Sequence, residues 1–87
     1  MVIDWLQNRI TVEEALIKHT PESRYAPQIP FGYLNFAWRR MLGKMRPGDE
    51  LWEYRSPPET WHKLRGRAGI ALVRNGKVIS SFTTKVN

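Results

Sequence analysis

The chain has 87 residues, enough for one hydrophobic core but not for a second of useful size, so residues 1–87 are expected to form a single small domain. It contains no cysteine, which excludes disulfide frameworks, thiolate nucleophiles and cysteine-ligated zinc sites. The formal net charge is +6, and residues 31–87 hold eleven basic against four acidic side chains, so the positive field belongs to the C-terminal two thirds.

Two helix-start patterns lie near the beginning of the chain. Asp4 with Gln7, and Thr11 with Glu14, match the capping box, in which the first side chain accepts a backbone amide and the second bonds back. The sequence therefore predicts two short helices, the second ended by Pro21. The apolar stripe of the second helix consists of Val12, Ala15, Leu16 and His19.

A loop and a third helix are expected next. The segment from Thr20 to Pro30 holds three prolines, which keep the backbone extended, so it is predicted to be a surface loop. Pro30 suits the first position of a helix, and Gly43 suits its left-handed terminator. Helical spacing is kept by Phe31, Leu34, Trp38, Met41, Leu42 and Met45.

The next segment alternates between strand and helix signals. Residues 51–54 are rich in β-favouring side chains and predict a strand. Ser56 with Glu59 forms another capping pattern, which predicts a helix of one or two turns. This helix would carry Trp61 and be closed by Gly66.

The chain then predicts a β-hairpin. Two β-type runs, 67–74 and 77–84, are joined by Asn75-Gly76, the pair typical of a type I′ turn. The whole pattern predicts an α+β fold, with N-terminal helices packed on a three-stranded, mostly antiparallel sheet that ends in the hairpin. The register of this turn places Ile70, Leu72 and Ile79 on one face, and Ala71, Val73, Val78 and Phe82 on the other.

No catalytic motif is complete in this sequence. It lacks the Walker loop and the G-x-G-x-x-G, H-E-x-x-H, EF-hand and G-x-S-x-G patterns. His19 and His62 fall on different elements and are interpreted as packing or capping residues. No catalytic, cofactor-binding or metal-ligating residue is assigned. An enzymatic alternative, a small hydrolase or lyase, would use His62 with Glu59 or Glu53.

Four tryptophans are a high number for a chain of this length. Trp38 and Trp52 fall on predicted apolar stripes and are interpreted as core residues. Packing is also favoured for Trp5 and Trp61, but exposure of either side chain would instead indicate a partner surface.

Basic side chains form two candidate surfaces. On the third predicted helix, Arg39 and Arg40 lie away from the apolar stripe with Phe36 between them, an arrangement that can hold a phosphate backbone and stack a base. An ordinary solvated helix face explains the same pattern and is the favoured interpretation. The second cluster surrounds the hairpin and its entry and consists of Lys63, Arg65, Arg67, Arg74 and Lys77.

Within the second cluster, two like charges are predicted to face each other. The hairpin register places Arg74 directly opposite Lys77, which costs a few tenths to about 1 kcal/mol unless an anion lies nearby. The sequence therefore indicates either an acidic partner or an internal acid, for which Glu53 on the neighbouring strand is the candidate.

One segment resembles other proteins. It runs from Gly48 to Gly76 and carries GDELWEY, then SPP, Trp61 and GRAGIALVRNG. This pattern is similar to a group of small uncharacterised bacterial proteins that end in a similar strand, proline-rich turn and hairpin. The resemblance implies a bacterial domain and brings no activity or catalytic residue with it.

These features favour a non-enzymatic binding module. Its expected partner is a protein, or a second copy of this chain, because the hairpin carries apolar groups on both faces. The alternative is a nucleic acid bound by Arg39, Arg40 and the hairpin cations, although no RNP, helix-turn-helix or zinc-finger signature is present. No signal-peptide pattern and no apolar run of about 18 residues occurs, so a cytoplasmic protein without a membrane partner is expected.

Overall fold

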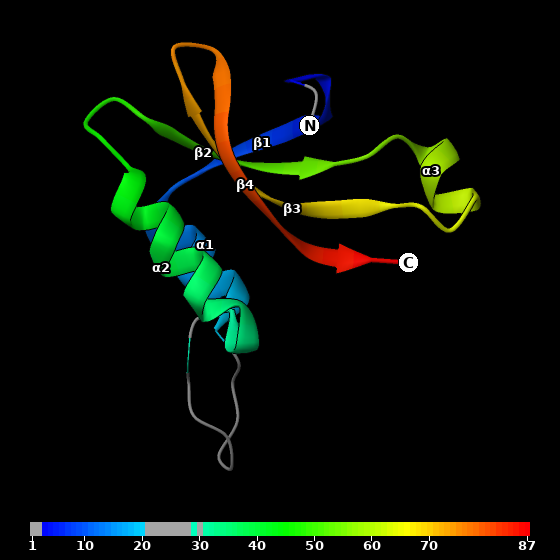
Figure 1. Ribbon diagram of the computed structural model, residues 1–87, viewed down its shortest axis with the longest axis horizontal. Helices are drawn as coiled ribbons and strands as arrows, with labels where there is room; N and C mark the ends of the chain where they lie inside the picture. The colour runs from blue at the N-terminus through cyan, green and yellow to red at the C-terminus, as the bar shows by residue number, and fades with distance from the viewer. Residues whose placement is uncertain (1–2, 21–28, 30) are drawn as a thin grey trace.

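The computed structural model describes residues 3–20, 29 and 31–87. Within them, four antiparallel strands form one sheet in which each strand pairs with the next along the chain (Figure 1). The predicted α+β fold with an antiparallel sheet is confirmed, but the predicted number of three strands was wrong. The strands are β1 (Leu6–Ile10), β2 (Glu50–Arg55), β3 (Arg67–Arg74) and β4 (Lys77–Val86).

The helices lie in two places. Helices α1 and α2 lie together against one face of the sheet, and the short helix α3 lies away from them, in the connection between β2 and β3 (Figure 1). None of the helices in the described part of the chain is long and apolar enough to cross a membrane. The helical elements are η1 (Ile3–Trp5), α1 (Val12–His19), η2 (Gly32–Leu34), α2 (Asn35–Lys44) and α3 (Pro58–His62).

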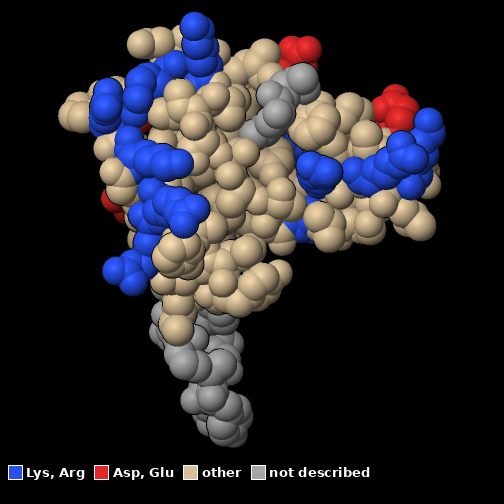
Figure 2. Space-filling view, viewed as in Figure 1, with Lys and Arg blue, Asp and Glu red and all other residues tan. Residues whose placement is uncertain are grey.

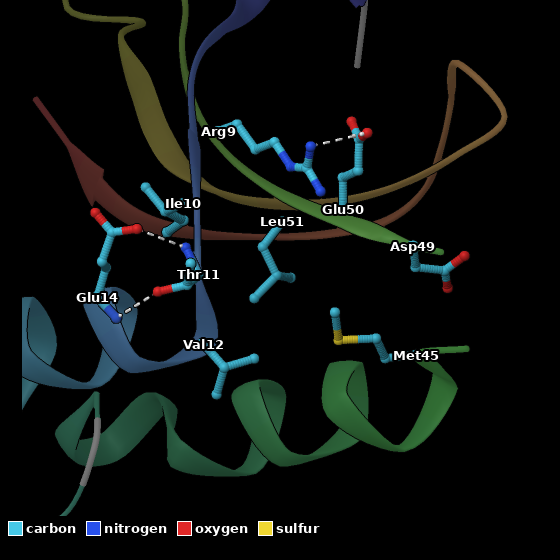
Figure 3. Close-up of a pocket in the computed structure, with 9 residues that line it drawn as sticks. All are labelled: Arg9, Ile10, Thr11, Val12, Glu14, Met45, Asp49, Glu50 and Leu51. Carbon is cyan, nitrogen blue, oxygen red and sulfur yellow. Dashed lines mark hydrogen bonds and ion pairs between the residues drawn. The ribbon is translucent and has the colours of Figure 1, made fainter. Parts of the chain in front are cut away.

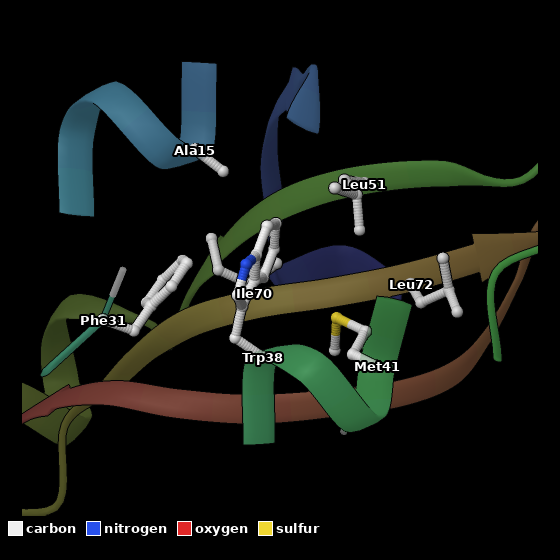
Figure 4. Close-up of a cluster of buried hydrophobic side chains, with 7 residues drawn as sticks. All are labelled: Ala15, Phe31, Trp38, Met41, Leu51, Ile70 and Leu72. Carbon is white, nitrogen blue, oxygen red and sulfur yellow. The ribbon is translucent and has the colours of Figure 1, made fainter. Parts of the chain in front are cut away.

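The core fills the space between α1, α2 and one face of the sheet (Figure 4). Helix α2 contributes Trp38 and Met41, and the strands contribute Leu51, Ile70 and Leu72, all of them almost completely buried. Burying one such side chain stabilises the fold by about 1.5–3 kcal/mol. Rotating α2 about its axis would expose Trp38 and Met41 to water, which is unfavourable. Burial of these side chains therefore keeps the opposite face of α2 toward solvent.

The helix predicted from Asp4 is wrong, because this segment forms the turn η1 and then strand β1. Gln7 closes no capping box; its side-chain amide donates to the Trp5 carbonyl oxygen over 3.4 Å. Strand pairing outweighs the local pattern, since Ile10 lies opposite Leu51 and packs against the core. A capping pattern depends only on residues close together in the sequence, so it cannot reveal pairing with a distant strand.

The helix predicted from Thr11 is confirmed as α1. The Thr11 hydroxyl accepts a hydrogen bond from the Glu14 backbone N–H, and the Thr11 N–H donates to the Glu14 carboxylate, each over 3.0 Å. This reciprocal pair is the capping box. The predicted end at Pro21, and nearly all of the predicted loop from Thr20 to Pro30, lie outside the described residues.

The predicted type I′ turn is confirmed, because Asn75 and Gly76 both have positive φ, 52° and 77°. Two residues further on the register shifts, and Leu72 lies opposite Ser80. This irregularity brings Phe82 opposite Ile70, on the face that the helices cover. The face assigned to Phe82 from the sequence was therefore wrong.

Three predicted helix boundaries also differ from the structure. Helix α2 continues through Gly43, which is therefore not its terminator. After α3 the left-handed residue is Leu64, with φ 57°, and not Gly66. Ser56 caps no amide of α3; its hydroxyl accepts a hydrogen bond from the Arg67 N–H over 2.8 Å.

Candidate functional site

The outer face of α2 carries exposed aromatic and basic side chains. They recur three or four residues apart, on the side of the helix opposite Trp38, and Tyr33 in η2 precedes them by the same spacing. We call this set the α2 surface. It consists of Tyr33, Phe36, Arg39, Arg40 and Lys44.

Aromatic and cationic groups are in contact on the α2 surface. The Phe36 side chain is 71% exposed, and the Arg40 guanidinium carbon lies 4.8 Å from the centre of its ring. This distance is typical of a cation–π contact. Tyr33 is 93% exposed and was missed by the sequence reasoning, because it falls between Phe31 and Leu34 but off their apolar stripe and has no basic neighbour in the sequence.

Phe31 fixes the beginning of this helical segment. Its backbone has a positive φ of 62°, a conformation that L-residues rarely adopt, and its N–H donates to the His19 carbonyl oxygen over 2.8 Å. Its ring stacks on the His19 ring at 4.4 Å and meets Trp38 at 4.7 Å. The contacts of Phe31 with His19 and Trp38 thus fix where η2 and α2 start, and with them the position of Tyr33.

The acid nearest to α2 in the sequence is already paired. No acidic residue occurs between Glu22 and Asp49, and Asp49 accepts two hydrogen bonds of 2.8 Å from the Arg74 guanidinium. These bonds lower the pKa of Asp49 from 3.8 to about 2, so its carboxylate stays ionised and paired near neutral pH. Arg74 also donates to the Lys44 carbonyl oxygen over 3.1 Å, which ties the hairpin to the end of α2.

The pair with Asp49 changes the interpretation of the hairpin. Arg74 does lie opposite Lys77, as predicted, but its charge is balanced inside the molecule. The acid is Asp49 and not the expected Glu53, which binds Lys18 of α1 over 2.5 Å. The like-charge pair therefore gives no indication of an outside partner, and Arg74 is better described as a structural residue than as a free contact.

The second cluster predicted from the sequence is divided in the structure: Arg74 and Lys77 lie at the hairpin turn, at the opposite end of β3 from α3. A separate group of basic side chains lies around Trp61 of α3. The Arg55 guanidinium lies 4.2 Å from the centre of the indole ring, and the Lys85 amino group lies 5.9 Å from it. The indole N–H donates to the Ser56 carbonyl oxygen over 3.1 Å, and a Cβ atom on Gly66 would lie only 2.1 Å from the ring. Trp61 is therefore half-buried and packs within its own turn.

Exposed cations surround this turn. Lys63, Arg65 and Arg67 are all exposed, as the sequence suggested for members of a contact surface. The Asn87 side chain ties the turn to the end of β4 by bonding the Gly66 N–H over 2.8 Å and the Trp61 carbonyl oxygen. We call the basic set the α3 surface. It consists of Arg55, Lys63, Arg65, Arg67 and Lys85.

The two basic surfaces appear on the same face of the molecule. Figure 2 shows Lys and Arg side chains gathered in a band over α2 and the hairpin, and in a second group toward α3. No member of the α2 or α3 surface forms an ion pair within the described residues. The ion pairs there are Arg9–Glu50, Lys18–Glu53 and Arg74–Asp49.

A groove of about 390 Å³ lies between the start of α1 and the end of α2 (Figure 3). Its polar side chains already have partners: Glu14 bonds Thr11, and Glu50 pairs with Arg9 over 3.5 Å. The described residues contain no group of three or more His, Asp or Glu side chains placed to hold a metal ion. The polar side chains of this groove are therefore engaged in internal contacts, and the groove is not treated as a candidate active site.

The two histidines lie on distant helices. His19 ends α1 and its Nε2 atom is buried without a hydrogen-bond partner among the described residues. Burial, with the nearby Lys18 charge, lowers the pKa of His19 from its ordinary value and so favours the neutral ring. His62 is exposed on α3, whereas the Glu53 carboxylate on β2 is paired with Lys18 of α1. An active site that combines His62 with Glu53 is therefore not formed.

The tryptophans occupy different environments. Trp38 is a core residue, as predicted, with 2% of its surface exposed. Trp52 is only half-buried, on the sheet face away from the helices, and its indole N–H donates to Glu50 over 2.9 Å. Trp5 is also half-buried, so neither Trp5 nor Trp61 is the fully exposed side chain that would mark an interface.

Comparison of the chain with protein-family models, with curated proteins and with solved structures gives no match. The resemblance of the segment from Gly48 to Gly76 to small bacterial proteins therefore stays a prediction.

Proposed function

We propose that this chain is a non-enzymatic binding module whose partner is a nucleic acid held on the α2 and α3 surfaces. The observation that carries the proposal is an excess of unpaired cations. Asp49, Glu50 and Glu53 are held in internal ion pairs, whereas the cations of these two surfaces have no carboxylate partner among the described residues. Lys and Arg side chains gather on one face of the molecule (Figure 2). A polymer with one negative charge per nucleotide complements such a face.

The main reason for preferring a protein partner is weaker in the folded chain. Ile70 and Leu72, one apolar face of the predicted hairpin, are buried beneath the helices. Arg74 is balanced by Asp49, so its charge supports neither kind of partner. Nucleic acid, the alternative from the sequence, therefore becomes the first candidate.

A protein partner remains the second candidate, supported by one observation. Strand β4 is ten residues long and forms an edge of the described sheet, so it has no strand partner on its outer side. Such an edge can pair with a strand of another chain, or with a second copy. Sedimentation that shows a monomer at all concentrations would remove self-association, for which the net charge of +6 is already unfavourable.

The test is fluorescence anisotropy with labelled oligonucleotides, at salt concentrations from about 20 to 200 mM. Binding should weaken steeply with salt, because every phosphate contact releases a counterion. Replacing Arg39→Gln and Arg40→Gln together should weaken binding several-fold and make the slope of log K against log salt shallower by about 2.

A control variant with the same loss of charge distinguishes a specific binding site from a general effect of net charge. Arg9→Gln with Lys18→Gln also removes two cations, but these are paired with Glu50 and Glu53. The control should retain most of the affinity. Equal loss in the two double variants, or no binding to any oligonucleotide at the lowest salt, would contradict the proposal.

A further inference from the structure

Two aromatic rings of the α2 surface are exposed to solvent and do not pack in the core. Tyr33 is 93% exposed and Phe36 is 71% exposed, whereas Phe31 and Trp38, in the same helical segment, are 7% and 2% exposed. The segment thus sorts its rings into two sets, one in the core and one toward solvent. The exposed rings lie one helical turn apart on the same side.

These rings stand on a rigid support. On the inner side of α2, Trp38 and Met41 are locked in the core, and Phe31 anchors the preceding turn. Exposed side chains on such a helix keep a defined direction, so a ligand would not have to order the backbone before it binds. Pre-organisation of this kind lowers the cost of binding.

The charges around the rings suit phosphate. Arg40 lies over Phe36 at 4.8 Å, and the exposed Arg39 and Lys44 flank this pair on its two sides. A rise of 1.5 Å per residue puts Phe36 and Lys44 roughly 12 Å apart along the helix axis, a length over which a strand presents more than one phosphate. Asp49, the first acid after α2, is neutralised by Arg74 and would not repel a phosphate.

We infer that the α2 surface binds single-stranded nucleic acid, with unpaired bases stacked on Tyr33 and Phe36 and phosphates held by Arg39, Arg40 and Lys44. This inference rests on the proposed function and narrows it. The faces of bases in a duplex are covered by their neighbours, so exposed rings have nothing to stack on there. An unpaired base offers its face to a ring or to a guanidinium plane such as that of Arg40.

The experiment removes the ring faces without changing charge. Tyr33→Leu with Phe36→Leu keeps apolar side chains at both exposed positions, and Ile17→Ala, at an exposed site on α1, is the matched control. The probes are a labelled single strand of roughly 12 nucleotides, a duplex of the same sequence, and a poly-glutamate peptide. Unchanged circular dichroism spectra would show that the variants stay folded.

The single strand should bind the unaltered chain more tightly than the duplex does. The leucine double variant should lose about tenfold or more in affinity for the single strand, with an unchanged salt slope, because stacking and not charge is removed. Arg40→Lys, which keeps the charge but loses the planar group, should lose affinity as well. Ile17→Ala should bind as the unaltered chain does.

Other results would overturn the inference in distinguishable ways. Equal binding of duplex and single strand, with no effect of the leucine substitutions, would end the stacking inference and leave the nucleic-acid proposal in place. Equal binding of poly-glutamate would reduce the surface to a general attraction for anions and end both. Absence of binding to every probe at low salt would end the proposed function itself.

Discussion

The pair between Asp49 and Arg74 illustrates what single residues contribute here. Its two hydrogen bonds join the turn after α2 to the end of β3, and a third bond from Arg74 reaches the Lys44 carbonyl oxygen. Twenty-five positions separate the two side chains in the sequence. No local pattern links them, which is why the sequence indicated the wrong acid. The capping box at Thr11, by contrast, spans three residues and was predictable.

A pH titration of stability tests this pair. Because the pKa of Asp49 is lowered from 3.8 to about 2, its pairing stabilises the folded chain above the unfolded pKa, and this contribution is lost as the pH falls toward 2. Urea midpoints measured between pH 5 and pH 2 should fall less steeply for Asp49→Asn than for the unaltered chain. Glu59→Gln, at an exposed position on α3, should keep the original steepness. Parallel profiles for Asp49→Asn and the unaltered chain would contradict the assignment.

Among the elements, β4 carries the feature that sequence reasoning could not supply. The turn residues Asn75 and Gly76 predict the hairpin correctly, because the required positive φ angles are local properties. The shift of register beyond Val78 depends on packing against the helices, and it decides which face Phe82 joins. Strand β1 was missed for a similar reason, since its identity comes from pairing with β2.

A core substitution measures the consequence of this shift. The Phe82 ring lies 5.2 Å from the Phe31 ring and 6.5 Å from Trp38, measured between ring centres. Phe82→Ala should therefore destabilise the fold by about 3 kcal/mol, observed as a lower urea midpoint. The neighbouring Ser81→Ala, at an exposed position, should change stability by less than about 0.5 kcal/mol. A similarly small effect at Phe82 would mean that the ring faces solvent.

At the scale of the whole molecule, the uneven charge is the main property. The composition predicted a positive field over the C-terminal two thirds, and the α2 and α3 surfaces both fall there. The sequence also identified Phe36, Arg39 and Arg40 on α2. It could not show that Arg74 is internally paired, nor that Arg55 and Lys85 come together over Trp61, because these contacts join separate strands and α3.

Salt should therefore stabilise this chain. Repulsion among unpaired cations opposes the folded state, and screening reduces it as ionic strength rises. The thermal midpoint should increase between about 20 and 200 mM NaCl, because the Debye length shortens over this range. A variant in which Lys63, Arg65 and Arg67 are all replaced by Gln should show a smaller increase. A midpoint that falls with salt would mean that the internal ion pairs outweigh the repulsion.

The placement of the α2 and α3 surfaces on one face has a consequence for the length of any bound polymer. A short strand reaches one surface at a time and leaves after each encounter. A longer strand that is held at one surface meets the other at high effective concentration, which multiplies the two weak affinities without any new contact. The affinity would then depend on the length of the strand as well as on its charge. Strands long enough to reach from the α2 surface to the α3 surface would bind preferentially.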